Sequence, residues 1–300
     1  MASKKIITVF GATGAQGGSV VGALLKDRSF AVRAVTRDAS KPAAVKLKES
    51  GAEVVSADLD NEKSLEAALN GAYGAFIVTN FWDHFSKDKE VKQGKSIADL
   101  CKRLGLHHVI YSGLENVNKL TGGKLEVLHF DGKGVVEEYF HQISVPMTSV
   151  RLAFYYENFL TAGKPQKSKD GNSYDLVIPM CDVPMDGISV SDLGPVVVSI
   201  LKNPKEYIGK NIGLSAEKLT VAQYADIMSK VSGKIIKDSK IPPEVYEKLP
   251  FQGAEEMANM FRFYMMLPDR DVPQTHKLNP NIKCFQRWLE ENKEAFIKAL

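Results

Sequence analysis

Three features are scarce in this sequence, and each scarcity excludes a class of protein. The three cysteines, Cys101, Cys181 and Cys284, lie far apart, which excludes a CxxC metal or redox motif and suits a reducing compartment. No run approaches the ~18 apolar residues that a membrane span requires. The 39 basic and 36 acidic residues are interspersed, so charge gives no reason to expect nucleic acid or a membrane as a direct partner.

The composition is otherwise that of an ordinary globular protein. The 300 residues are 44% hydrophobic and 25% charged, and this length suggests about two domains. The first residues, Met-Ala-Ser-Lys-Lys, lead directly into an apolar run, so we expect no secretory signal. A cytoplasmic protein is therefore expected, with nuclear entry neither indicated nor excluded.

The strongest motif lies in residues 6–18. An apolar run ends at Gly11, glycines recur at Gly14 and Gly17, and an apolar helical pattern follows. This order predicts a strand, a tight turn and a helix, which is the first βα unit of a dinucleotide fold. The free N–H groups and positive dipole of such a helix bind phosphate. The alternative is a purely structural turn, and the strand before and the helix after it favour the nucleotide site.

The end of the second predicted strand, residues 31–37, selects the cofactor. An acidic residue at this position accepts a hydrogen bond from the ribose 2′-hydroxyl of NAD, whereas a cation accommodates the 2′-phosphate of NADP. Arg37 offers a planar fork suited to phosphate and Lys41 a second charge. Two alternatives remain: both cations are merely solvated, or a register error of one residue puts Asp38 at the decisive position.

The ends of the next strands should reach the same crevice. Asp58 and Leu59 follow the third strand and either line the adenine or form a helix N-terminus favoured by negative charge. Thr79, Asn80 and Phe81 follow the fourth strand and should lie near the middle of the cofactor. Residues 84–90 are predicted to be a polar loop, followed by a helix on which Lys92 faces either the crevice or water.

The spacing of these elements predicts the fold class. Five alternating βα units and a sixth strand at residues 145–151 indicate an α/β protein with a Rossmann-type, doubly wound parallel sheet. We predict an NADP-binding domain at residues 1–152 and a smaller C-terminal α/β, substrate-like lobe at 153–300, interleaved with and packed on the first. In that lobe, a Met- and Phe-rich helix at 256–266 either forms a groove for a substrate or partner or packs in the core against the main domain. Residues 285–296 are predicted to form a last amphipathic helix.

Four stretches resemble the NmrA-like family, an atypical branch of the short-chain dehydrogenases/reductases. They are residues 11–17, residues 111–116, residues 151–158, and Leu278-Asn-Pro together with Trp288-Leu. The resemblance implies an NADP(H)-binding redox sensor, a homodimer, and partners such as argininosuccinate synthetase and inflammatory-signalling components. The nucleotide contacts that it implies are Gly11, Ala12, Thr13, Gly14, Ala15, Gln16, Gly17, Arg37, Lys41, Asp58, Leu59, Thr79, Asn80, Phe81, Lys92, Lys133, Tyr155, Tyr156, Glu157 and Asn158.

The chain departs from the active members of the wider superfamily at the catalytic tyrosine. Active enzymes use Ser, Tyr and Lys, with Tyr-x-x-x-Lys placing phenol and ammonium on successive helical turns. Here the spacing is His129-Phe-Asp-Gly-Lys133, with Ser112 in the serine neighbourhood. A cation beside a histidine is expected to disfavour the charged imidazole, which is unfavourable for a proton donor. We therefore expect no dehydrogenase turnover; the alternative is an NADPH-dependent reductase of a small carbonyl compound that uses His129, Lys133 or Tyr111.

Overall fold

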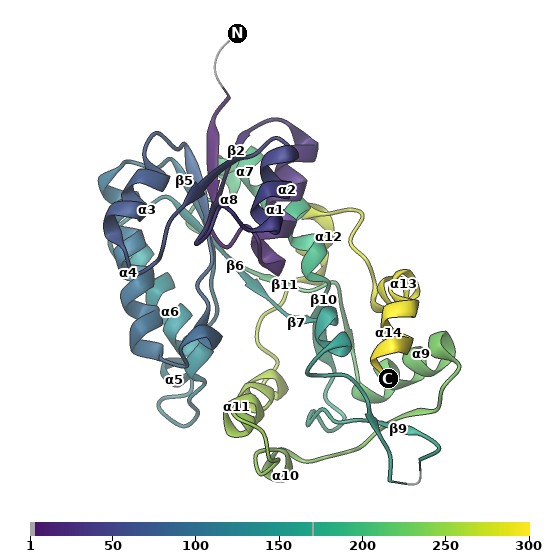
Figure 1. The fold of residues 1–300 in the computed structure, drawn as a ribbon. Helices are drawn as coiled ribbons and strands as arrows, with labels where there is room; N and C mark the ends of the chain where they lie inside the picture. The colour runs from purple at the N-terminus through teal and green to yellow at the C-terminus, as the bar shows by residue number, and fades with distance from the viewer. Residues whose placement is uncertain (1–3, 170) are drawn as a thin grey trace. The chain divides into compact units, whose positions relative to one another are not determined.

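The computed structural model describes residues 4–169 and 171–300 and divides into two compact units (Figure 1). Unit 1 contains the chain up to Asn116 and two later segments, Leu128–Arg151 and Ser191–Ile212. Unit 2 contains Val117–Val127, Leu152–Val190 and Gly213–Leu300. The predicted boundary at residue 152 falls beside one of these transitions, but the two units also exchange segments on either side of it.

Unit 1 is built on a seven-stranded sheet. The pairs among its first six strands are parallel, which confirms the predicted doubly wound α/β fold. The order is β11 (Asn211–Leu214), β6 (Met147–Leu152), β5 (His108–Ser112), β4 (Gly74–Ile77), β1 (Ile6–Val9), β2 (Ala31–Thr36) and β3 (Glu53–Ser56). The direction of winding reverses between β1 and β4, and ligands of doubly wound sheets bind at such a point, outside the carboxyl ends of the strands.

Helices cover both faces of this sheet (Figure 1). One face carries α3 (Glu62–Leu69), α4 (Lys87–Arg103) and α6 (Leu128–Gln142), whose apolar side chains form a continuous core with strand residues such as Ile77, Val109 and Met147. The other helices of unit 1 are α1 (Ala15–Asp27), α2 (Pro42–Glu49), α7 (Leu193–Lys202) and α8 (Pro204–Tyr207). The central strands β4 and β5 are buried along their whole length, as expected for a parallel sheet covered by helices on both faces.

The segment that returns to unit 1 from the C-terminal half packs tightly against α1. A Cβ on Gly194 of α7 would lie 2.1 Å from the carbonyl oxygen of Ser19, so only glycine fits at this crossing. The Ser19 hydroxyl accepts a hydrogen bond from the Gly194 N–H at 2.9 Å and donates one to the Ser191 carbonyl at 2.8 Å. The α1 helix is thereby fixed along its length by residues almost 180 positions further along the chain.

Unit 2 contains two three-stranded sheets and several short helices. One sheet has the order β12-β10-β7 and the other β13-β9-β8. The strands are β7 (Phe154–Tyr155), β8 (Gln166–Lys167), β9 (Tyr174–Leu176), β10 (Met185–Ile188), β12 (Glu217–Leu219) and β13 (Ile236–Asp238). The helices are α5 (Val117–Leu120), α9 (Val221–Ser232), α10 (Pro243–Tyr246), α11 (Ala254–Met265), α12 (Val272–Leu278), α13 (Phe285–Glu291) and α14 (Lys293–Ala299).

The core of unit 2 is aromatic. Tyr156, Tyr224 and Phe285 are fully buried, and their ring centroids lie 4.7 to 6.4 Å apart. Ring pairs at such distances add stabilisation beyond the area that they bury. The Met- and Phe-rich helix is α11, and it buries Met260 and Phe261 in unit 2, as expected for core packing.

Two local predictions were wrong. The predicted loop at 84–90 is shorter, because Ser86 caps α4 by accepting a hydrogen bond from the Lys89 N–H, so the helix begins at Lys87. The predicted single helix at 285–296 is two helices separated at Asn292, whose side-chain amide donates to the Trp288 carbonyl oxygen at 2.8 Å.

Candidate functional site

The glycine-rich turn after β1 is too crowded for side chains. Gly11 has a φ of +60°, in the left-handed region that glycine favours, and a Cβ there would lie 2.9 Å from a methyl group of Val78. A Cβ on Gly17 would lie 2.2 Å from the Gly11 carbonyl oxygen. Gly14 is the N-cap of α1 and supplies no side-chain cap, and the first turn contains no acidic residue. The helix N-terminus therefore presents backbone and a positive dipole to an anion.

The rest of this turn has the exposure that a backbone phosphate site requires. Thr13, Gly14 and Ala15 are exposed and Gln16 is half-buried, whereas Ala12 is fully buried. The Ala12 N–H donates to the Val35 carbonyl oxygen at 3.2 Å, which attaches the turn to β2. The turn is therefore attached to the sheet through Ala12, and its residues at the N-terminus of α1 are exposed to solvent.

The two residues after β2, Arg37 and Asp38, have different surroundings. The Asp38 carboxylate turns back into its own loop and accepts hydrogen bonds from the Ser40 N–H and hydroxyl at 2.9 and 2.6 Å. These bonds to Ser40 hold the pKa of Asp38 below its usual value. The Arg37 guanidinium is 75% exposed and lies 3.4 Å from a carboxylate oxygen of Asp83, and exposed ion pairs of this kind are weak. Arg37 is thus available at the strand end, and exposed Lys41 follows as the N-cap of α2.

The loop after β3 exposes Asp58 and half-buries Leu59 against the apolar core. Neither aspartate in the loop caps α3, since Asn61 does so by accepting from the Ser64 N–H. The Asp58 carboxylate accepts from the Asp60 N–H at 2.8 Å, and Asp60 contacts Lys89 and Gln93 of α4 at 3.0 and 2.9 Å. Asp58 and Asp60 lie just before the N-cap of α3, so the alternative of a helix N-terminus favoured by negative charge and the proximity of Asp58 to adenine both stay predictions.

A buried polar cluster follows β4. The ammonium of Lys133 on α6 donates to the Thr79 carbonyl oxygen at 2.8 Å, to the Thr79 hydroxyl at 2.9 Å, and to Glu90 Oε1. The Thr79 hydroxyl in turn donates to Glu90 Oε1 at 2.7 Å. Glu90 is fully buried and the Lys133 side chain is 11% exposed. All three N–H groups of Lys133 therefore have protein acceptors, and a ribose hydroxyl would have to share or replace one of them.

His129 lies one helical turn before Lys133 under aromatic side chains. Its ring centroid is 4.9 Å from that of Trp82 and 5.9 Å from that of Phe81. Trp82 and Phe85 are 40% and 46% exposed, whereas His129 is only 7% exposed. Trp82 lies in a short 3₁₀ turn, Phe81–Asp83, which Asn80 caps: its side-chain oxygen accepts a hydrogen bond from the Trp82 N–H. The position that the catalytic tyrosine occupies in active enzymes is thus covered by Trp82 in unit 1.

The remaining candidates of unit 1 differ in accessibility. Tyr111 and Ser112 are buried on β5, and burial, followed by the charge of Glu90, raises the pKa of the Tyr111 phenol well above its ordinary value. A Tyr111 with that pKa is a poor proton donor near neutral pH. Lys92 lies exposed on α4, and whether it contacts nucleotide stays a prediction.

The four candidates of unit 2, residues 155–158, start a short 3₁₀ turn after β7. The Tyr156 side chain is fully buried, and its hydroxyl donates to Glu217 at 3.2 Å. The Glu157 carboxylate accepts from the Ser189 hydroxyl at 2.6 Å and the Val190 N–H at 3.0 Å. Tyr155 and Asn158 are half-buried. A nucleotide contact by Tyr156 or Glu157 would therefore use backbone atoms.

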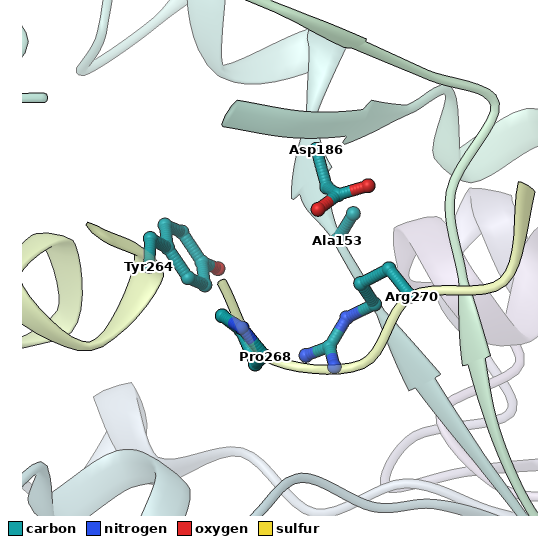
Figure 2. A pocket seen from close by; sticks show the side chains of 5 residues that line it. All are labelled: Ala153, Asp186, Tyr264, Pro268 and Arg270. Atoms are coloured by element: carbon teal, nitrogen blue, oxygen red, sulfur yellow. The ribbon is translucent and has the colours of Figure 1, made fainter. Parts of the chain in front are cut away.

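Unit 2 also contains a water-sized pocket. Figure 2 shows the Asp186 carboxylate, the Arg270 guanidinium and the Tyr264 hydroxyl around it, with Ala153 and Pro268 completing its lining. Its volume of about 10 Å³ is that of a single water molecule. Burial raises the pKa of Asp186 above its usual value. The pocket is too small to be a substrate site in this conformation.

Two further features are absent from residues 4–169 and 171–300. These residues contain no group of three or more His, Cys, Asp or Glu side chains arranged to hold a metal ion. Among the helices of the same residues, none has both the length and the apolar character needed to cross a membrane.

A model of the NmrA-like family matches residues 3–281 of the sequence. The chain belongs to the NmrA-like family. It is 30% identical to NmrA-like family domain-containing protein 1 of Rattus norvegicus over 97% of this chain and 98% of the relative. It is also 33% identical to the NmrA-like family domain-containing oxidoreductase malD of Malbranchea aurantiaca, over 86% of this chain and 82% of that protein.

The fold of this NmrA-like chain also matches a solved structure of a family member. The crystal structure of NmrA, a negative transcriptional regulator, in complex with NADP superposes with a TM-score of 0.82 and 23% identity, covering 100% of this chain and 99% of NmrA. This likeness confirms the fold. The NmrA-like relatives thus include both a regulator and a protein named as an oxidoreductase.

Two residues of this NmrA-like site were missed from the sequence. Glu90 lies in the charged run Lys87-Asp-Lys-Glu90, which resembles an exposed loop, and only the packing of α4 against α6 buries it. Trp82 follows directly after the predicted contact Phe81, and its cover over His129 depends on α6, which is distant in the sequence. Tertiary packing creates both features, so no local pattern marked them.

Proposed function

We propose that this chain binds NADP(H) at the carboxyl edge of the unit 1 sheet and regulates partner proteins through an NADPH-dependent change in conformation or oligomeric state. The pyrophosphate would bind the turn at Gly11–Gly17 and the N-terminus of α1, and the 2′-phosphate would bind Arg37 and Lys41. Asp58 and Leu59 would adjoin the adenine. The other half of the cofactor would then extend past β4, toward Thr79 and Lys133.

The exposed Arg37 at the end of β2 is the observation that carries this proposal. The carboxylate next to Arg37 in the sequence, Asp38, accepts hydrogen bonds from Ser40, and the carboxylate that pairs with Arg37, Asp83, is half exposed. A planar cation with a weak, exposed partner can exchange that partner for a phosphate, whose bidentate bonds are stronger. NADP(H) is therefore favoured over NAD(H).

The absence of dehydrogenase turnover rests on the region of the missing tyrosine. His129 replaces the phenol, Trp82 covers the imidazole, and the Lys133 ammonium already has three acceptors. A proton donor for a carbonyl oxygen is thus missing from the usual position. The site favours holding a nicotinamide over reacting with it.

For the protein to act as a sensor, NADPH must bind one of its conformations or oligomeric states better than the other. A ligand with equal affinity for both states does not change their relative populations. We propose a cytoplasmic homodimer whose assembly depends on NADPH. The family resemblance suggests argininosuccinate synthetase and inflammatory-signalling components as partners.

Calorimetric titration of the full chain with NADPH, NADP⁺, NADH and NAD⁺, followed by sizing of each complex, tests the proposal. Arg37→Ala should weaken NADPH binding about 10- to 100-fold, because hydrogen bonds to charged groups contribute roughly 1.5–3 kcal/mol, and should leave NADH binding unchanged. Arg103→Ala is the matched control, since Arg103 is also exposed and paired with surface carboxylates. The proposal would be contradicted if the wild-type protein bound NADPH and NADH with equal affinity. It would also be contradicted if the size of the protein in solution were the same with and without nucleotide.

An active reductase of a small carbonyl compound is the second candidate, and the family relative named as an oxidoreductase favours it. His129 and Lys133 would then act on a substrate after displacement of Trp82. Steady loss of NADPH absorbance with a carbonyl compound, abolished by Lys133→Ala, would support this candidate against the first.

A further inference from the structure

The cluster of Thr79, Glu90 and Lys133, hereafter the Lys133 cluster, lies where the nicotinamide half of a dinucleotide would extend. Ligands cross doubly wound sheets at the point where the winding reverses, here between β1 and β4. Arg37 assigns the adenosine half to the β2 side, so the nicotinamide half falls on the β4 side, where Thr79 follows the strand. This placement rests on the proposed function.

The Lys133 cluster contains two opposite charges that are both withdrawn from water. Glu90 is fully buried, the Lys133 side chain is 11% exposed, and their charged atoms are in direct contact. Buried charges are screened less than exposed ones, so each acts on its surroundings over a longer range. Together they contribute no net charge, whereas either one alone would contribute a full unit.

The close approach of Glu90 to α6 is built into the helix. A Cβ on Gly132 would lie 3.1 Å from Glu90 Oε2, so the glycine beside Lys133 leaves the space that the carboxylate occupies. Glu90 is thereby held against the helix that carries Lys133. Its position is a packed feature of unit 1 and does not depend on a flexible surface side chain.

NADP⁺ and NADPH differ at the nicotinamide ring, which carries a positive charge only in the oxidised form. Arg37 cannot distinguish them, because both carry the same 2′-phosphate. We propose that Glu90 is the residue that sets the preference between NADP⁺ and NADPH, by neutralising the positive charge that Lys133 would otherwise direct at the nicotinamide. Without Glu90 the site would repel NADP⁺ and retain NADPH.

The test compares dissociation constants for NADP⁺, NADPH and 2′,5′-ADP in the full chain and in Glu90→Gln. The amide oxygen of this variant can still accept from Lys133, so the lysine keeps three acceptors and its charge. The ratio Kd(NADP⁺)/Kd(NADPH) should rise about 4- to 20-fold, from Coulomb's law for one unit charge at roughly 10 Å and an effective dielectric of about 20 to 40. The affinity for 2′,5′-ADP, which lacks the nicotinamide riboside, should stay unchanged.

Further variants separate charge from structural damage. Glu90→Gln/Lys133→Met removes both charges and should return the ratio to within about twofold of the unchanged protein. Lys133→Met alone leaves Glu90 buried without its counter-ion, as a charged or a neutral group, and should give a ratio no higher than that of the double variant. A higher ratio would contradict the proposal, which gives a second measurement if Glu90→Gln does not fold. Buried Asp131, also on α6, is the same in every variant and cancels in these comparisons.

An unchanged ratio in folded Glu90→Gln would overturn the proposal. Equal weakening of NADP⁺ and NADPH binding would also overturn it, since that result describes a structural role alone. If the unchanged protein binds 2′,5′-ADP and NADPH while Glu90→Gln leaves the ratio unaltered, this inference fails and the proposed function stands. If it binds neither, the proposed function itself fails.

Discussion

Replacing Gly17 by alanine tests the packing of the turn that joins β1 to α1. The added Cβ would lie 2.2 Å from the carbonyl oxygen and 2.5 Å from the carbonyl carbon of Gly11, and 2.7 Å from the Phe10 carbonyl oxygen. All three neighbours are backbone atoms, so no side chain can rotate away, and the helix or the turn must move.

The size of the effect follows from two opposing terms. Overpacking a tight site costs typically 1–3 kcal/mol, whereas alanine gains at most about 1 kcal/mol over glycine in a helix. Gly22→Ala in the same helix is the matched control, because Gly22 is exposed and its Cβ would have no neighbour within 4 Å. Gly22→Ala should therefore stabilise the protein by about 0.5–1 kcal/mol. Because this gain is common to both variants, they should differ by the overpacking cost alone, roughly 1–3 kcal/mol.

Urea unfolding followed by circular dichroism measures this difference in the free energy of unfolding. It is obtained from the urea concentrations at the midpoints of the two transitions, with the same dependence on urea assumed for both variants. Gly17→Ala should also lose NADPH binding, since the backbone that faces the phosphates is displaced. If Gly17→Ala were as stable as Gly22→Ala, the close approach of Gly17 to Gly11 would be refuted as a constraint on this turn.

Two further predictions concern stability outside the nucleotide site. Burial lowers the pKa of His108 to about 4 from 6.5, so its stabilising contribution, about 3 kcal/mol at most, is present above pH 6.5 and is lost as the pH falls toward 4. Urea midpoints measured across that window should fall less steeply in His108→Gln than in the exposed control His107→Gln, and parallel curves would contradict the assignment. Thr220→Ala removes the reciprocal cap that Thr220 and Gln223 form on α9 and should cost about 1 kcal/mol, whereas Thr220→Ser should retain most of that stability; equal losses would show that the cap is not the cause.

The parts of the fold that the sequence predicted are those with local causes. Glycine spacing and apolar runs predicted β1, α1 and the parallel sheet, because a strand that is buried on both faces consists mainly of apolar residues. His107 is exposed and His108 is buried, in line with the rule that successive side chains of a strand point to opposite faces. The place of Arg37 directly after β2 was predicted because it depends on the end of one strand.

The features that the sequence did not predict depend on distant segments. From the sequence alone, Glu90 resembles a surface residue, and only the packing of α6 shows that it is buried. Trp82 likewise resembles an ordinary loop residue, and its contact with His129 depends on the position of α6. The extent of unit 1 was missed for the same reason, because Ser191–Ile212 has no local pattern that assigns it to the first half of the chain.

The exchange of segments between the units also constrains how the protein is made. The chain passes from one unit to the other five times, and α7, which locks α1, is among the last parts of unit 1 to be synthesised. A ribosome that has completed only the first 152 residues has therefore released a sheet without its edge strand β11 and with α1 uncovered. Such a nascent chain exposes apolar surface until about sixty more residues emerge, which makes this interval the one in which aggregation or chaperone binding is most favoured.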